Sequence, residues 1–167
     1  MMRAKDVLYR AFTKLHGVVL FRSKGRVFGR AAGMTVVGLV TIGRKTGQRR
    51  TTILTAPIAE DDRVVLVASF GGDDRHPAWY HNLRADSEVQ VILRGTTRTL
   101  IARTATGPER VALWEKIVKI HGGYGRYQQR TDRQIPVVVL EPASGDRGAD
   151  QAVGAVRHRD DHALPEA

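Results

Sequence analysis

A pair of short β-branched segments joined by a cationic, glycine-containing turn constrains the fold of this chain more than any other feature. The segments are Thr35–Ile42 and Thr51–Thr55, and the turn between them spans Gly43–Arg50. Its cations are Arg44, Lys45, Arg49 and Arg50. β-Branched side chains favour strands, and glycine favours tight turns. The pattern therefore predicts a β-hairpin whose positive tip suits phosphate or carboxylate groups. An ordinary solvated tip is the alternative.

Further strand signals follow one another along the chain with few helices between them. The predicted strands cover residues 36–42, 51–58, 63–69, 89–93, 97–103 and 136–140. Helices are predicted over residues 4–22 and 78–84, and over the segment that follows Pro108 and ends before Gly122; a short segment over residues 124–130 follows. Because strands and helices do not alternate as βαβ units, this order indicates a mainly β, α+β fold, an antiparallel barrel with peripheral helices.

The helix before Gly122 has a start signal and an apolar side of its own. Thr106-Gly-Pro-Glu109 predicts a capping box, in which the threonine and glutamate side chains bond to backbone amides of the first turn. One side of the helix holds Val111, Trp114, Ile117, Val118 and His121.

The chain of 167 residues divides into three segments. Residues 1–34 are predicted to form a basic amphipathic helix and a connector, and residues 35–142 the barrel domain. Residues 143–167 lack aromatic side chains and periodicity, which predicts a disordered tail. The basic helix can lie on an anionic membrane, or it can pack on the domain core or on a second subunit.

Positive charge is concentrated at the amino end. The first 50 residues carry 12 Lys and Arg side chains and one acid, whereas residues 51–167 carry 15 basic and 16 acidic side chains. The whole excess, +10 for the chain, therefore belongs to the first 50 residues. Such a field attracts nucleic acid, an acidic membrane surface or a phosphorylated cofactor.

Several classes of site are excluded by what the sequence lacks. The absence of cysteine excludes disulfides, thiolate metal sites and a cysteine nucleophile. No apolar run approaches the ~18 residues that span a bilayer, and no signal peptide is recognisable, so a cytoplasmic protein is expected. Paired histidines at metal-ligand spacing occur only in the predicted tail, so no metal site is expected.

Three further segments carry residues suited to ligand binding. In Ala68-Ser-Phe-Gly-Gly72, a strand end followed by glycines can present a hydroxyl and backbone amides to a phosphate or a ring carbonyl. In His76–Leu83, Pro77 starts a helix whose amino end suits an anion. In His121–Tyr127, two tyrosines beside a histidine can form an aromatic lid that donates a proton. Each segment has a structural alternative: an ordinary loop, core packing by Trp79 and Leu83, backbone capping by Asn82, and tyrosines that pack a helix end.

Taken in order, these segments resemble the deazaflavin (coenzyme F420)-dependent nitroreductase family of actinobacteria. The matching stretches are Gly43–Arg50, Ala68–Gly72, His76–Leu83, Tyr124–Gln128 and Thr131–Val139. The resemblance implies a split β-barrel, related to the FMN-binding pyridoxamine-phosphate oxidases, in residues 35–142. It implies an F420H2-dependent oxidoreductase that reduces quinones, nitro compounds or activated enones, and a homodimer. The basic amino-terminal helix also resembles one that gives some relatives membrane affinity.

The resemblance also assigns residues to the cofactor and the substrate. Those implied to bind the cofactor's phosphate and polyglutamate tail are Arg44, Lys45 and Arg50. Those implied to line the deazaflavin ring and complete its groove are Thr52, Ile53, Leu54, Ala68, Ser69, Gly71, Gly72, Pro77, Trp79, Tyr80, Asn82 and Leu83. Those implied to face the substrate as catalytic groups are Ser69, Tyr124 and Tyr127. Two positions depart from the family pattern: Phe70 replaces a frequent lysine, and His121 replaces a tyrosine of nitroimidazole-activating members.

Two other functions remain open from the sequence. The same barrel can bind FMN in place of F420, although the density of cations favours a polyglutamate tail. Alternatively, the basic amino end can make the chain a non-enzymatic membrane or nucleic-acid module. The segments richest in chemistry lie beyond residue 50, where the chain is nearly neutral, so no nucleic-acid partner is expected.

Overall fold

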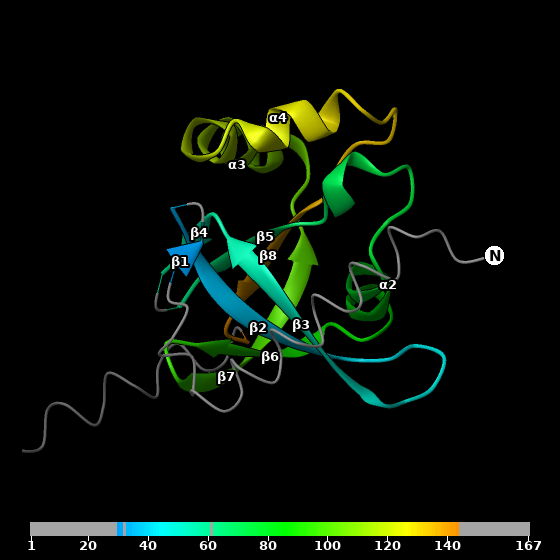
Figure 1. The fold of residues 1–167 in the computed structure, drawn as a ribbon. Helices are drawn as coiled ribbons and strands as arrows, with labels where there is room; N and C mark the ends of the chain where they lie inside the picture. The colour runs from blue at the N-terminus through cyan, green and yellow to red at the C-terminus, as the bar shows by residue number, and fades with distance from the viewer. Residues whose placement is uncertain (1–29, 32, 61, 144–167) are drawn as a thin grey trace, which may run out of the picture.

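The computed structural model describes residues 30–31, 33–60 and 62–143 (Figure 1). The strands are β1 Arg30–Ala31, β2 Met34–Ile42, β3 Arg49–Ala56, β4 Ile58–Ala59, β5 Val64–Val67, β6 Glu88–Leu93, β7 Thr96–Thr104 and β8 Val137–Glu141. The helices are the 3-10 turn η1 Phe70–Gly72 and the α-helices α2 Ala78–Ala85, α3 Gly107–Ile120 and α4 Gly123–Gln128. The predicted helix over residues 4–22 and nearly all of the predicted tail lie outside the described residues.

The strands form one antiparallel sheet that curls into an open barrel. Its order is β1-β2-β6-β7-β8-β5-β4, and β3 pairs with the other edge of β2. β3 comes close to β5, but no backbone pairing joins these two strands in the part of the chain that the structure describes. The barrel is therefore split beside β3. α3 and α4 lie together at one end of it, and α2 lies apart from them at its flank (Figure 1). The predicted barrel of antiparallel strands is confirmed.

Two hydrophobic cores share β5 and β8. Val64 and Leu66 face the core inside the barrel, together with Trp79 and Leu83 of α2. The alternate residues of the same strands, Val65 and Val67 in β5, face a second core with Leu113 and Ile117 of α3. Because both faces of these strands are buried, their sequences are continuous apolar runs without alternation.

The first hairpin differs in its boundaries from the prediction. Arg49 and Arg50, predicted to belong to the turn, begin β3 and pair with Ile42 and Thr41. The single strand predicted over 51–58 is interrupted at Pro57, because proline has no N–H for the ladder. After this break, β4 pairs with β5 instead of β2. The short strand β1 falls in the predicted connector.

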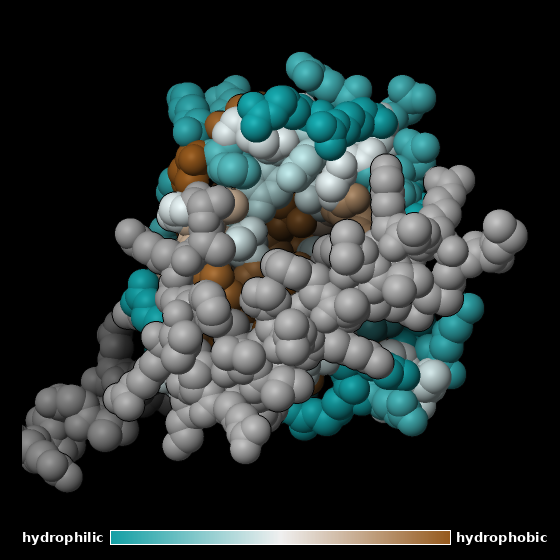
Figure 2. All heavy atoms as spheres, viewed as in Figure 1, coloured by the Kyte–Doolittle hydropathy of each residue, from teal (hydrophilic) through white to brown (hydrophobic). Residues whose placement is uncertain are grey.

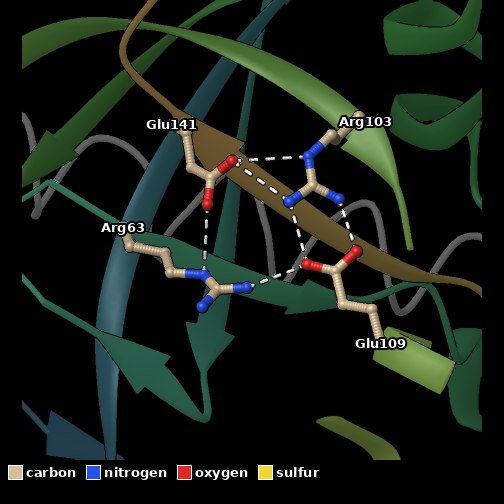
Figure 3. A network of polar contacts seen from close by, with 4 residues as sticks. All are labelled: Arg63, Arg103, Glu109 and Glu141. Carbon is tan, nitrogen blue, oxygen red and sulfur yellow. Dashed lines mark hydrogen bonds and ion pairs between the residues drawn. The ribbon is translucent and has the colours of Figure 1, made fainter. Parts of the chain in front are cut away.

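The predicted capping box of α3 is wrong. Thr106 occupies the N-cap position, but its side chain makes no capping bond. The Glu109 carboxylate accepts hydrogen bonds from Arg103 at 2.6 and 2.9 Å and from Arg63 at 3.0 Å (Figure 3). Glu141 pairs with the same two guanidiniums, at 3.1 Å to Arg103 Nη2 and 3.3 Å to Arg63 Nε. The contact to Arg63 Nε is an ion pair without hydrogen-bond alignment.

The predicted apolar side of α3 is also partly wrong. Leu113 and Ile117, four residues apart, are the residues buried against the barrel. Val111 is 55% exposed, because two residues correspond to about half a turn and place it opposite Leu113. Trp114 and Val118 pack beside the second core as predicted.

Candidate active site

The tip of the β2–β3 hairpin is held by a compact set of backbone bonds. Gly43 N donates to Gln48 O at 2.8 Å, and Gly43 O accepts from Thr46 N and Gly47 N at 2.9 and 2.8 Å. Gly47 has a φ of +65°, a conformation that favours glycine. The tip therefore has a defined shape, and Arg44 and Lys45 project from it into solvent.

Asn82 of α2 ties this tip to the rest of the molecule. Its Oδ1 accepts a hydrogen bond from Arg44 N at 3.2 Å, and its Nδ2 donates to Thr41 Oγ1 at 3.1 Å. Both Asn82 and Thr41 are buried. Asn82 thus braces the hairpin backbone, which is the capping alternative considered from the sequence.

The register of the hairpin separates its two adjacent arginines. Arg50 pairs with Thr41, so both side chains lie on the face of the sheet that meets α2. Arg49 lies on the opposite face, where its guanidinium donates to Gln90 Oε1 of β6. Arg50 is exposed, and within the described part of the chain its guanidinium bonds only to the neighbouring Gln48 Oε1, at 3.0 Å. Arg50 therefore lies on the α2 side, and the charge of Arg44 also reaches this side, since it acts on His81 of α2.

β3 presents a half-buried wall beside this cationic tip. Thr52 and Leu54 share the face of Arg50 and of the inner core, whereas Ile53 lies on the other face with Thr55. All four side chains are intermediate in exposure. Figure 2 shows apolar surface recessed below the hydrophilic rim of α3 and α4 on the side of the molecule where β3 lies. A flat apolar ring can pack along such a strand, on one of its faces or across its unpaired edge.

The Ser69–Gly72 loop has an unusual backbone. Phe70, Gly71 and Gly72 have φ values of +50°, +67° and +82°, three consecutive residues in the left-handed region. A Cβ on Gly72 would lie 2.7 Å from Tyr127 O, so the loop packs directly against the backbone of α4. Nothing lies within 4 Å of a Cβ built on Gly71. Gly71 is exposed, Ser69 and Phe70 are half-buried, and Ala68 and Gly72 are buried.

The predicted groove residues of α2 are mostly core residues. Trp79, Tyr80 and Leu83 are buried in the inner core, and Tyr80 Oη lies 3.1 Å from Thr104 Oγ1. Pro77, also buried, precedes the first turn of α2. This follows from the topology, because α2 lies against β2 and covers the inner core. These side chains support the site more than they line it.

The two tyrosines of α4 differ in access. Tyr124 is 5% exposed, and its hydroxyl lies 3.4 Å from Thr55 Oγ1 and 3.8 Å from Met34 Sδ. Burial raises the pKa of the Tyr124 phenol above its ordinary value, so it stays protonated. Tyr127 is half-buried and meets Tyr124 edge to face, with 6.1 Å between ring centroids. Trp79 belongs to the other core, so it is not part of this aromatic pair.

Sequence reasoning missed the positive groups behind the loop and on α2. Arg133 was recognised only as one letter of a matching stretch, yet its guanidinium bonds to the Ser69–Gly72 loop and to His76. Burial, the Arg133 charge and neighbouring His81 and Arg84 lower the pKa of His76. Burial and the charges of Arg44 and Arg84 lower the pKa of His81. The sequence did contain a signal for these groups, because cations and histidines lie close together on both sides of Pro77.

This geometry combines an exposed cationic tip, a half-buried apolar strand and a glycine loop with an accessible hydroxyl. Residues 12–142, which include all of these groups, match a family model described as F420H(2)-dependent quinone reductase. The chain belongs to this family. The family uses coenzyme F420, so the cofactor is F420 rather than FMN, and the chain is an oxidoreductase rather than a non-enzymatic module.

Individual relatives agree with the family assignment. An F420H(2)-dependent quinone reductase of Mycobacterium tuberculosis is 37% identical over 131 residues, which cover 76% of this chain and 87% of that protein. A solved structure of an F420-H2 dependent reductase is 36% identical, with a TM-score of 0.58 over 64% of this chain and 93% of that one. A second solved chain, described as a domain-swapped dimer, is 29% identical, with a TM-score of 0.61 over 83% of this chain and its own full length. The predicted family and split-barrel fold are confirmed.

The residues present fit this cofactor. Arg44, Lys45 and Arg50 give an anionic tail three exposed cations at the tip of the hairpin, and β3 gives the ring a half-buried apolar wall. The described residues contain no cluster of His, Asp or Glu that would hold a metal ion. Within those same residues, no helix is long and apolar enough to cross a membrane.

Proposed function

We propose that the chain reduces a quinone with F420H2, which binds between the hairpin tip, β3 and the Ser69–Gly72 loop. The observation that carries this placement is the register of the hairpin. It puts Arg50 beside the Asn82 brace and turns Arg49 away. Arg44, Lys45 and Arg50 would hold the phosphate and polyglutamate tail through charge-assisted bonds. Thr52, Ile53 and Leu54 would line the ring.

When bound, F420H2 supplies the hydride. The chain's own residues position the acceptor and supply the proton that completes the reduced product. Ser69 Oγ and Tyr127 Oη are the proton-carrying atoms that stand in accessible positions. Tyr124 stays protonated and holds Tyr127 by edge-to-face packing. The apolar walls of β3 and α4 exclude water from the reacting groups.

The binding site can be tested with a pair of adjacent substitutions. Arg50→Ala removes a charged contact to the tail, and we expect the Kd for F420 to rise about tenfold. This effect is at the low end of the range for a charged hydrogen bond, because the side chain is exposed. Arg49→Ala is the matched control, since Arg49 lies on the opposite face. Titration by F420 fluorescence anisotropy measures both. Equal effects of the two substitutions would contradict the placement of the tail.

The tyrosine pair has a different expected signature. In the double variant Tyr124→Phe and Tyr127→Phe, the phenol protons are lost while the rings remain. We expect kcat for quinone reduction to fall by about one to two orders of magnitude, the range of acid–base assistance, with a much smaller change in F420 affinity. Stopped-flow oxidation of F420H2 separates the two quantities. A loss of cofactor affinity at unchanged kcat would remove both residues from the catalytic role.

The range of acceptors is part of the same proposal. The Mycobacterium tuberculosis relative is named a quinone reductase. Nitro compounds and activated enones are further acceptors that we propose on chemical grounds, since both accept a hydride. His121 stacks edge to face on Tyr124 at 5.5 Å and so borders the aromatic pair. A parallel screen of quinones, enones and nitroimidazoles would rank these classes.

We also propose a homodimer that works in the cytoplasm with peripheral contact to an anionic membrane. The domain-swapped dimer among the similar structures supports self-association. The excess of positive charge in the first 50 residues supports membrane contact. Analytical ultracentrifugation tests the first, and co-sedimentation with vesicles of anionic and of neutral lipid tests the second. A monomer, or equal binding to both vesicle types, would contradict the respective proposal.

A further inference from the structure

A single guanidinium lies behind the Ser69–Gly72 loop and bonds to it from within. Arg133 Nη2 donates to Ala68 O at 3.1 Å and to Ser69 O at 2.8 Å, and Arg133 Nε donates to Asp73 O at 2.8 Å. Arg133 Nη1 lies 3.1 Å from His76 Nδ1. The guanidinium thus bonds to backbone carbonyls on both sides of η1 and to the residue that precedes Pro77.

The loop needs such support because its backbone is strained. The left-handed region is unfavourable for an L-residue, and Phe70 adopts this conformation at a φ of +50°. The glycines that follow lose conformational freedom when they are fixed. Such a backbone persists only where its surroundings over-determine it. The three carbonyl bonds of Arg133 supply that constraint.

Arg133 is itself fixed by α4. Gln128, the last residue of α4, donates from Nε2 to Arg133 O at 2.8 Å and accepts from Ile135 N at 2.9 Å. Thr131 Oγ1 donates to Asp74 Oδ1 at 2.9 Å. Residues 131–135 therefore connect the end of the tyrosine-bearing helix to the far end of the loop. Gly72 also joins the loop to α4, because it packs closely against Tyr127 O.

We propose that Arg133 is the positioning residue of the site. It holds the Ser69–Gly72 loop in its left-handed shape and sets that loop against α4. Ser69 and the tyrosines are thereby placed correctly relative to the cofactor and the acceptor. This inference rests on the proposed function. Its action is through the loop, because three of its four bonds go to backbone carbonyls of the loop and its flanking residues. A lysine has one point of attachment and cannot reproduce a planar fork that reaches three carbonyls and an imidazole.

The test uses Arg133→Lys, which keeps the charge and loses the fork. We expect kcat to fall at least tenfold and the Kd for F420 to rise several-fold, while the KM for the quinone changes less than twofold. Arg126→Gln is the matched control. Arg126 is exposed on α4, and its guanidinium makes no bond or ion pair among the described residues. The control should retain wild-type values. Circular dichroism and thermal unfolding show whether each variant is folded.

A milder pair of variants covers the case in which Arg133→Lys does not fold. His76→Ala removes one of the four Arg133 partners, and His76→Asn keeps an acceptor near the Nδ1 position. We expect His76→Ala to lower kcat about threefold and His76→Asn to restore it. The inference is overturned if folded Arg133→Lys has wild-type kcat and F420 affinity, or if the two His76 variants are indistinguishable from wild type. Failure of the wild-type protein to bind F420 would instead overturn the proposed function.

Discussion

At the scale of single residues, two adjacent glycines of the candidate site have different structural duties. Gly71 and Gly72 both lie in the left-handed region, at φ of +67° and +82°. Only Gly72 has neighbours that exclude a Cβ, with Tyr127 O at 2.7 Å and Arg130 Cβ at 3.0 Å. The pair therefore separates the cost of backbone strain from the cost of a steric clash.

Alanine substitutions at the two glycines are expected to differ in stability. Gly71→Ala should lose about 1 kcal/mol, the cost of the left-handed conformation alone. For Gly72→Ala, the free energy of unfolding should fall by at least about 2 kcal/mol more, because the loop must move away from α4 or the helix must shift. A loss of this size is typical of overpacked cores. Urea unfolding of both variants gives the free energies. Equal losses would show that the loop does not depend on its contact with α4.

Residue chemistry alone predicted partners poorly at this scale. Asn82 was assigned to the cofactor groove, and its amide instead bonds to the hairpin. An amide side chain carries donors and acceptors for either duty, so the sequence cannot choose between them. The buried role of Arg133 was equally invisible, since arginine is usually an exposed residue. The cationic tip and the Ser69 loop were predictable as turns because glycine favours tight turns, whereas their contact with the cofactor stays a prediction.

At the scale of elements, α3 is attached to the barrel by charge as well as by its apolar side. Arg63, Arg103, Glu109 and Glu141 connect the helix to β7, β8 and the start of β5 (Figure 3). The hydrogen bond from Arg103 lowers the pKa of the Glu109 carboxyl, and burial opposes this effect. These side chains are 31–45% exposed, so solvent screens each pair.

Glu109→Gln is expected to destabilise the protein by about 0.5–1 kcal/mol at neutral pH, as for a partly exposed network. Because the pKa of Glu109 is lowered on folding, its contribution is complete above the ordinary value of 4.5 and is lost as the pH falls through the folded value. The difference between wild type and variant should therefore vanish in acid. Urea unfolding at a series of pH values measures it. A constant difference from pH 7 to pH 3 would contradict this role of Glu109.

Elements were predicted well where one physical cause dominates. The continuous apolar runs of β5 and β8 were recognised as strands, and the proline before Ala78 gave the start of α2. Boundaries failed where a competing interaction decides. Glu109 bonds to Arg103 of β7 and to Arg63, which lies before β5, and so does not cap α3. Tertiary partners of this kind are not encoded in local spacing. The break at Pro57 was visible in the sequence, because proline disfavours the interior of a strand, and it was missed.

At the scale of the whole molecule, the distribution of charge acts on association with the cofactor. The chain carries a formal charge of +10 at pH 7, and its candidate tail site lies at a basic hairpin. A field of this sign steers an anionic ligand toward the site, and salt screens the field. Charge therefore influences how fast F420 arrives, in addition to how firmly it is held.

The association rate constant of F420 is accordingly expected to fall by about an order of magnitude between 10 and 200 mM salt, the scale of steered association. Arg50→Ala should lower the slope of this dependence, whereas kcat at saturating cofactor should respond weakly to salt. Stopped-flow fluorescence gives the rate constants. A rate that does not change with ionic strength would exclude a steering role for the basic end of the chain.

The pairing of β3 on one edge has a consequence for how this protein can diversify. A strand with one neighbour transmits a change of side chain to one ladder only, so Thr52, Ile53 and Leu54 can vary with limited damage to the barrel. The loop behind Ser69 has no such freedom, because α4 and Arg133 fix it. After gene duplication, changes in how the cofactor ring is held would therefore arise along β3, and libraries for directed evolution of cofactor binding are best concentrated there.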